Sequence, residues 1–271
     1  MTGTLAVDEP VAVRVTHDVP PHLAPFVEMA VGYDYRLQAP GLHAGLPSQY
    51  LTIVVSLDDP VDMIAMPDPG QMPAALGALV GGIAAAPVSI RHDGTQIGIH
   101  LGVTPLGARA LFGMPSGELA WQILPLDAVL GPAPELVDRL NSLDSWPERF
   151  AALDDVLTRA VRDVEAAAPA EVSFAFHRLV TSAGRIGVSS LASEIGWSRR
   201  HLADQFGKEF GLAPKLMARV LRFERATGML RSTFRPPLAV VAAECGYADQ
   251  AHMTREWVEF AGNSPTVWLA E

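Results

Sequence analysis

The sequence predicts an α+β protein in which a β-rich N-terminal domain with flanking helices precedes an all-helical domain. Three observations support this prediction. β-branched and alternating segments are concentrated before Val103, helical periodicity dominates after Pro105, and a helix–turn–helix pattern occurs twice in the last third of the chain. The length of 271 residues suits about two domains of ordinary size.

The charge is distributed unevenly between the two expected domains. The net charge of −10 argues by itself against a nucleic-acid partner. From Glu171 onward, however, 12 Lys and Arg residues outnumber 10 Asp and Glu residues, a net of +2, and the remainder carries −12. The basic groups gather around the repeated pattern, which permits a nucleic-acid partner for the C-terminal part.

Cysteine content and hydropathy limit the class of protein further. Cys245 is the single cysteine, which excludes an internal disulfide and a cysteine-based zinc cluster. The first residues lack the basic and apolar segments of a signal peptide, and the weakly polar run 76–88 is too short to span a bilayer. We therefore expect a soluble, cytoplasmic protein with no membrane association.

The N-terminal domain carries the strand signals. The segment 49–57 is rich in β-branched residues and lies between turn-forming residues, and 61–65 is its expected partner. Segments 87–92 and 96–103 flank Asp93-Gly94, a dipeptide typical of two-residue hairpins. Glycines alternate with larger residues in 96–103, which predicts a close backbone approach on one face of that strand.

Helical periodicity follows the strands. Helices are expected at residues 106–112, 133–143 and 146–167. The small, proline-containing segment 167–170 is the expected domain boundary, because the charge balance changes there. The N-terminal domain is accordingly assigned to residues 1–167 and the helical domain to residues 171–271.

The repeated pattern occupies Leu191–Pro214 and Val241–Pro265. Small residues, turn glycines, aromatic residues and a closing proline recur at matching positions, with one extra turn residue, Ala248, in the second copy. The matched pairs are Ala192/Ala242, Glu194/Glu244, Gly196/Gly246, Trp197/Tyr247, His201/His252, Leu202/Met253, Phe206/Trp257, Gly211/Gly262 and Pro214/Pro265. Such correspondence predicts two helix–turn–helix units, at 188–211 and 238–262, joined by a helix at 214–232.

Each repeated position has a physical reason. The turn glycines Gly196 and Gly246 suit a positive φ at the end of a helix. Ser198 and Asp249 are expected N-caps of the second helix in each unit. Apolar residues spaced four apart then face inward. The residues expected to face outward are Arg199, Arg200, Ala203 and Asp204 in the first unit and Gln250, Ala251, Thr254 and Arg255 in the second.

The joining helix predicts the geometry of the pair. It has about 17 to 19 residues and is therefore about 25 to 28 Å long, which would place the second helices of the two units close to one DNA turn apart, about 34 Å. Basic residues on and beside it are candidates for contact with phosphates. They are Lys208, Lys215, Arg219, Arg222 and Arg225.

Residues from about Val172 to Trp268 resemble the DNA-binding domain of AraC/XylS-type transcriptional regulators. The stretch GYADQAHMTREWVEFAGNSP, which closes on Phe260, Gly262 and Pro265, carries the resemblance most specifically. The resemblance implies that double-stranded operator DNA is the partner. It places the base-reading positions at Arg200, Ala203 and Asp204 in the first unit, and at Gln250, Ala251, Thr254 and Arg255 in the second.

Some of these positions depart from a simple pattern of polar readers. Ala203 and Ala251 offer apolar contact, for example to a thymine methyl group. Asp204 either accepts a hydrogen bond from a cytosine amine or pairs with Arg200. Because Arg199, Arg200 and Lys208 concentrate charge in the first unit, we expect that unit to dominate affinity and the second to add selectivity.

Residues 92–161 resemble the N-terminal region of a poorly characterised group of such regulators, which is thought to be a cupin-like sensing or dimerising domain. The resemblance names no ligand, and we expect no cofactor.

The N-terminal histidines lack a metal-ligand spacing, so we expect no metal site. They are His17, His22, His43, His92 and His100. Four aromatic residues are either ligand contacts or core residues, and the core is favoured. They are Tyr33, Tyr35, Tyr50 and Trp121.

The expected function is that of a sequence-specific transcription regulator, not an enzyme. Its expected partners are operator DNA, an unknown small-molecule effector, a second copy of the chain, and RNA polymerase if it activates transcription. The alternative is an N-terminal enzyme targeted to DNA by the helical domain, although the Gly-x-Ser-x-Gly pattern of one hydrolase class is absent from the sequence. A third interpretation is an adaptor that binds a partner protein.

Overall fold

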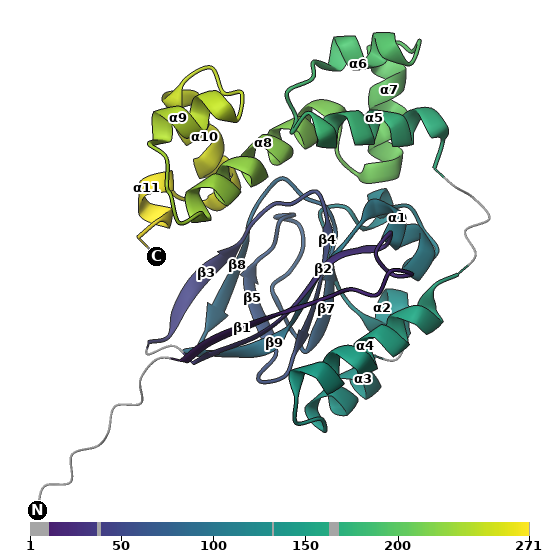
Figure 1. Cartoon of the computed structure of the whole chain (residues 1–271), viewed down its shortest axis with the longest axis vertical. Helices are drawn as coiled ribbons and strands as arrows, with labels where there is room; N and C mark the ends of the chain where they lie inside the picture. The colour runs from purple at the N-terminus through teal and green to yellow at the C-terminus, as the bar shows by residue number, and fades with distance from the viewer. Residues whose placement is uncertain (1–10, 37–38, 132, 163–167, 271) are drawn as a thin grey trace, which may run out of the picture.

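The computed structural model describes residues 11–36, 39–131, 133–162 and 168–270. A β-rich part comes first, followed by short helices and then an all-helical part, so the predicted fold class is confirmed. The long helix α8 (Pro214–Arg231) runs above the two sheets and carries a group of helices at each end (Figure 1).

The strands form two antiparallel sheets. One sheet has six strands in the order β1-β2-β9-β4-β7-β10, and the other has four in the order β3-β8-β5-β6. The strands are β1 Val11–His17, β2 Val27–Arg36, β3 Gly41–Gly45, β4 Leu51–Ser56, β5 Val61–Ala65, β6 Ala74–Leu76, β7 Ala78–Gly81, β8 Val88–His92, β9 Thr95–Val103 and β10 Ile123–Pro125.

The strand partners differ from the prediction at two places. Strand β4 pairs with β9 and β7, whereas β5 pairs with β8 and β6 in the other sheet. Strands β8 and β9 also belong to different sheets, so Asp93-Gly94 is a crossing between sheets and not a hairpin. There the Asp93 carboxylate accepts a hydrogen bond from the Thr95 backbone at 2.9 Å, a local turn that needs no strand pairing.

The predicted close approach on β9 is confirmed. A Cβ atom at Gly98 would lie 2.6 Å from the Tyr33 hydroxyl and 2.7 Å from the Val55 carbonyl oxygen. At Gly102 it would lie 2.9 Å from the Met29 side chain. Glycine at these positions therefore leaves room for neighbouring side chains on the face of β9 that points between the sheets.

Short helices pack against a face of the six-stranded sheet, where the Trp146 ring lies directly over Gly32 of β2. They are α1 Pro105–Gly107, the π-helical turn η1 Ala108–Phe112, the 3-10 turn η2 Ser116–Leu119, α2 Asp127–Leu130, α3 Ala133–Asn141 and α4 Trp146–Ala160. The helix predicted at 146–167 ends early, because the Arg162 backbone N–H donates to the carbonyl of Ala110 and draws the chain toward η1. Residues 163–167 of that prediction lie outside the described residues.

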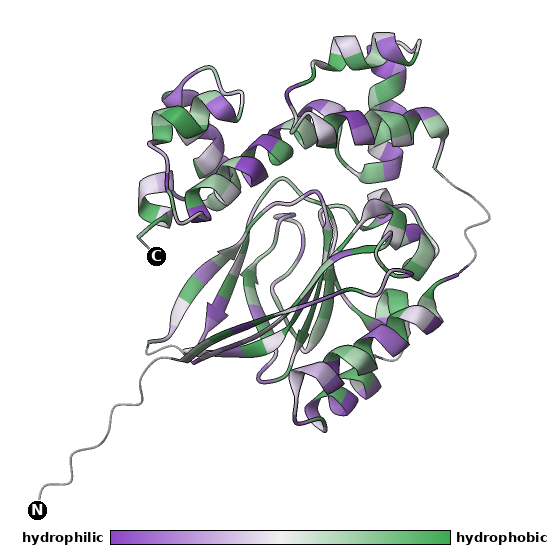
Figure 2. Cartoon of the chain, viewed as in Figure 1, coloured by the Kyte–Doolittle hydropathy of each residue, from purple (hydrophilic) through white to green (hydrophobic). Residues whose placement is uncertain are grey.

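The C-terminal helices agree with the prediction to within about one residue at each end. They are α5 Ala170–Thr181, α6 Val188–Glu194, α7 Arg199–Phe210, α8, α9 Leu238–Glu244, α10 Gln250–Ala261 and α11 Pro265–Trp268. Hydrophobic and hydrophilic residues alternate along these helices, as expected for helices packed on one side (Figure 2). No helix in the described part of the chain is long and apolar enough to cross a membrane.

Candidate nucleic-acid interface and interdomain cavity

Helices α7 and α10 begin at the residues that the repeated pattern predicts, directly after the expected N-caps. The Ser198 hydroxyl accepts a hydrogen bond from the His201 backbone at 3.1 Å, and the Asp249 carboxylate accepts one from the His252 backbone at 2.6 Å. The turn glycines Gly196 and Gly246 have φ values of 72° and 79°. These local features fix the start of each helix and therefore the side that it presents.

The two faces of each helix separate cleanly. Leu202 and Phe206 on α7, and Met253 and Trp257 on α10, are completely buried. Six of the predicted DNA-facing side chains are exposed and two are half-buried. The exposed ones are Arg199, Arg200, Asp204, Gln250, Ala251 and Arg255, and the half-buried ones are Ala203 and Thr254. The structure thus brings the predicted residues to one side of each helix, and their contact with DNA remains a prediction.

Asp204 pairs with Lys208 and not with Arg200. The Lys208 ammonium donates to the Asp204 carboxylate at 2.9 Å, and this hydrogen bond lowers the pKa of Asp204. Both side chains are exposed, so the pair contributes little to stability. Lys208 can therefore exchange this partner for a phosphate without a large loss.

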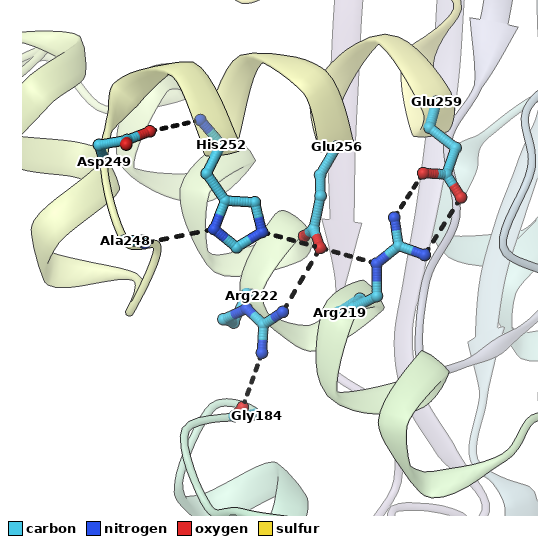
Figure 3. Close-up of polar contacts among 8 residues, drawn as sticks. All are labelled: Gly184, Arg219, Arg222, Ala248, Asp249, His252, Glu256 and Glu259. Carbon is cyan, nitrogen blue, oxygen red and sulfur yellow. Dashed lines mark hydrogen bonds and ion pairs between the residues drawn. The ribbon is translucent and has the colours of Figure 1, made fainter.

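Two arginines predicted to contact phosphates are engaged inside the domain instead (Figure 3). Arg219 Nε donates to Glu256 Oε1 at 2.7 Å, and its terminal nitrogens bind Glu259. Arg222 donates to the Gly184 carbonyl at 3.2 Å and lies 3.5 Å from Glu256 Oε1. Arg219 and Arg222 thus hold α10 against α8, and contact of either side chain with a phosphate stays a prediction.

The N-terminal domain docks against the C-terminal end of α7. Arg109 on η1 forms two hydrogen bonds with the Glu209 carboxylate, at 2.8 and 2.6 Å, and the side chains are 15 % and 7 % exposed. The Ser116 hydroxyl donates to the Glu209 carbonyl at 3.0 Å. A Cβ atom at Gly117 would lie 2.3 Å from the Lys208 carbonyl oxygen, so the two backbones are in direct contact.

A cavity of about 650 Å³ lies between the two sheets and is bounded by α8. This volume is typical of sites for small molecules. Its walls are largely apolar and come from both sheets and from α8. Representative lining residues are Met29, Val31, Val54, Met63, Ile90 and Phe223.

The cavity also has polar groups, among them three tyrosines that the sequence offered as possible ligand contacts. Tyr33, Tyr35 and Tyr50 line it, so the preference for core packing was wrong for these three. Burial raises the pKa of Tyr33 and of Tyr50 to about 12, which keeps both phenols neutral. Burial also lowers the pKa of His100, which lines the same wall.

Two guanidinium groups line the cavity from different domains. Arg14 comes from β1 and Arg231 from the last turn of α8. Partial burial and the nearby Arg14 lower the pKa of Arg231. Within the described residues neither side chain forms an ion pair with a carboxylate, and Arg231 lies 5.1 Å from the centre of the Trp268 ring. Both residues are exposed at the edge of the cavity, and their positive charges suit an anionic group.

Comparison with known proteins identifies the helical part. Residues 191–271 match the sequence profile of a family described as a helix-turn-helix domain. The C-terminal part of this chain is a helix-turn-helix domain. No curated protein sequence matches the chain.

The helix-turn-helix domain and the sheets together share their fold with ToxT from Vibrio cholerae O395, at a TM-score of 0.54 and 10 % identity, over 89 % of this chain and 97 % of that chain. Wild-type ToxT from Vibrio cholerae strain SCE256 with a bound unsaturated fatty acid gives 0.54 and 11 %, over 89 % and 94 %. ToxT bound to (E)-4-(8-methylnaphthalen-1-yl)but-3-enoic acid gives 0.53 and 10 %, over 89 % and 97 %. At these identities the likeness shows a common fold.

Glu224 on α8 attaches the helix-turn-helix domain to the rim of the cavity. The Ser48 hydroxyl donates to its carboxylate at 3.0 Å and the Gln49 amide donates at 2.9 Å. Burial raises the pKa of Glu224, and the nearby Glu28 adds to this effect. The two hydrogen bonds act in the opposite direction and are outweighed.

We expect this attachment to weaken as the pH rises. The folded-state pKa of Glu224 lies above its unfolded value, so its contribution is fully present below the ordinary carboxyl pKa of about 4.3 and is lost as the pH rises through the raised value. Glu224→Gln, which mimics the protonated group, should flatten this part of the profile. Urea midpoints of both proteins between about pH 4 and 7.5 measure it. Parallel profiles would contradict the assignment to Glu224.

The histidines of the N-terminal domain are dispersed. The His43 and His92 rings are 5.7 Å apart, whereas His100 lies on the other sheet. His17 binds Asp154 at 2.9 Å and His22 binds Thr158 at 2.8 Å, which ties the start of the chain to α4. Among the described residues no three His, Cys, Asp or Glu side chains are grouped so that they could hold a metal ion.

Proposed function

We propose that this protein is a sequence-specific DNA-binding transcription regulator controlled by a small molecule in the interdomain cavity. The observation that carries the proposal is the double role of α8, which joins the two helix–turn–helix units and also forms a wall of the cavity. A ligand that contacts α8 in one arrangement of the domains and not in another shifts the equilibrium between states of different DNA affinity.

The proposed base-reading residues are Arg200, Ala203 and Asp204 in the first unit and Gln250, Ala251, Thr254 and Arg255 in the second. Arg199 and Lys208 are proposed to bind phosphates and to give the first unit most of the affinity. The support for these roles is the exposure of these side chains on the face opposite the buried core of each helix. A helix inserted into the major groove presents this kind of face to the base edges.

A selected DNA site tests the assignment of roles. Arg200→Ala and Arg255→Ala should each lose about 1–3 kcal/mol of discrimination at particular base pairs, because a bidentate contact to a base is removed. Lys208→Ala should weaken binding to all sequences alike and reduce the salt dependence by about one phosphate contact. Gel shifts with a randomised duplex library, followed by single-base variants of the selected site, measure both. Equal loss across all sequences for Arg200→Ala would remove it as a base reader.

The proposed ligand is an amphiphilic acid with an apolar body. The apolar walls suit the body, and Arg14 and Arg231 suit the acid group. The ToxT structures support this class, because their ligands are an unsaturated fatty acid and an arylbutenoic acid.

Titration with hexadecenoic acid tests the ligand class. We expect it to change the affinity for the selected DNA, and Arg231→Gln to weaken the effect of the acid at least about tenfold, since a hydrogen bond to a charged group contributes about 1.5–3 kcal/mol. Arg235→Gln removes the same charge from an exposed residue that does not line the cavity and should leave the response unchanged. Equal responses of the two variants would contradict the proposed acid site.

The proposal includes three finer points. We place the regulator in the cytoplasm, where operator DNA is accessible, and we include self-association of the N-terminal domain and contact with RNA polymerase at activated promoters. Sedimentation of the free protein tests self-association. Transcription in vitro from a promoter that carries the selected site, with and without the protein, tests contact with polymerase.

A further inference from the structure

The second helix–turn–helix unit meets the turn that leads into the first unit at a junction around Arg222 (Figure 3). Arg222 lies on α8 and donates to the carbonyl of Gly184, which belongs to the turn between α5 and α6 on the side of the first unit. The same guanidinium lies 3.5 Å from Glu256 on α10 and 5.6 Å from the centre of the Tyr247 ring, both in the second unit. One side chain therefore contacts both the second unit and the turn that leads into the first.

Backbone packing leaves little freedom at this junction. A Cβ atom at Gly184 would lie 2.1 Å from the Ala218 carbonyl oxygen, so the α5–α6 turn rests directly on α8. A Cβ atom at Gly246 would lie 3.1 Å from the Arg185 side chain and 3.7 Å from that of Arg222. The turn of the second unit therefore lies close to the Arg185 side chain of the α5–α6 turn.

The charged groups at the junction are largely buried, and the Glu256 carboxylate has several partners. The side chain of Glu256 is 8 % exposed and that of Arg222 is 16 % exposed. Glu256 Oε1 also accepts from Arg219 at 2.7 Å and lies 3.4 Å from His252 Nε2. The backbone N–H of Ala248 donates to the other ring nitrogen of His252 at 3.3 Å, so the network extends to the turn before α10.

We propose that Arg222 fixes the rotation of the second unit relative to the first and thereby sets the separation between the two DNA segments that the protein reads. The helix α8 sets the distance between the units, but contacts across the junction set how α10 is turned about the axis of α8. Arg219 joins α8 to α10 of the second unit, whereas Arg222 also reaches the α5–α6 turn that leads into the first unit. Arg222 is a positioning residue and need not touch DNA. This inference rests on the proposed function, because it requires both units to bind DNA.

The spacing of the DNA site is the property to measure. The probes are the duplex selected from a randomised library and versions of it with one or two base pairs inserted or deleted between the two recognised segments. One base pair shifts the second segment by about 3.4 Å and turns it by about a tenth of a helical turn. Wild-type protein should lose at least about 30-fold in affinity with one inserted pair. Arg222→Leu should reduce this penalty to about threefold or less.

Arg225→Leu is the matched control. Arg225 lies on the same helix, and its carboxylate partner, Glu244 at 3.9 Å, belongs to the second unit. This variant should keep the wild-type spacing penalty. Glu256→Gln preserves the shape of the side chain and removes the shared charge, and it should reduce the spacing penalty as Arg222→Leu does. If circular dichroism shows that Arg222→Leu does not fold, Glu256→Gln is the variant that tests the inference.

The possible outcomes separate this inference from the function on which it rests. A wild-type protein that binds no duplex would contradict the proposed function and this inference with it. A wild-type protein that binds but tolerates every spacing would contradict this inference alone. So would an Arg222→Leu protein that binds all duplexes more weakly and keeps the wild-type ratio between spacings.

Discussion

Replacing Trp257 by alanine should destabilise the helical domain by about 3–5 kcal/mol, the usual cost of truncating a large buried aromatic side chain. Trp257 is completely buried, and its ring packs edge-to-face against Phe223 at 4.9 Å and Trp268 at 5.2 Å. Its removal leaves a cavity where α8, α10 and α11 meet. Since domains are stable by only about 5–15 kcal/mol, a large share of the stability is lost.

Urea unfolding followed by circular dichroism measures this loss. Val258→Ala is the matched control, because Val258 is the next residue on α10 and is 45 % exposed. That substitution should change the free energy of unfolding by less than about 0.5 kcal/mol. A Trp257→Ala protein within about 1 kcal/mol of the wild type would contradict the packing described for the second unit.

Arg109→Leu should cost about 3 kcal/mol and separate the unfolding of the two domains. The substitution leaves the Glu209 carboxylate buried without its guanidinium partner, and breaking a buried ion pair on one side costs about 3–5 kcal/mol. The lower end applies because both side chains retain slight exposure. We expect one cooperative thermal transition in the wild type and two in the variant, because docking on α7 is weakened.

Differential scanning calorimetry detects the change, and two further variants control for it. Arg139→Leu removes an exposed ion pair with Asp155 and should leave a single transition. The double variant Arg109→Leu with Glu209→Leu should regain stability relative to Arg109→Leu, since no buried charge remains unpaired. An Arg109→Leu protein that unfolds like Arg139→Leu would show that this pair does not hold the domains together.

The helical domain was predictable because its signals are local. Ser198 and Asp249 cap their helices through residues three positions away, and Gly211 and Gly262 end them with positive φ. Strand pairing is not local. Strand β9 pairs with β2 and β4, which lie far earlier in the chain. The prediction paired segments that are neighbours in sequence, β4 with β5 and β8 with β9, and in both cases the two strands belong to different sheets.

The interdomain cavity was beyond sequence reasoning, because its polar residues come from β1, β2 and α8 and meet only in the folded chain. One signal of the contact between the two domains, away from the cavity, was available nonetheless. Glu209 lies three residues after Phe206 and directly before Phe210, on the inward face of α7, where a charged residue needs a partner. Its partner, Arg109, could not be chosen from the sequence, because many arginines are equally eligible.

The position of α8 has a consequence for building hybrid regulators. By sequence the helix belongs to the C-terminal domain, yet Phe223, Glu224, Thr227 and Arg231 complete a cavity of the N-terminal one. A chimera joined near residue 170 would take its N-terminal domain from one parent and α8 from the other. The wall of the cavity that α8 forms would then come from the wrong parent. A chimera that keeps the ligand response of its N-terminal domain therefore also needs these four residues from the same parent, although they lie more than fifty positions beyond the junction.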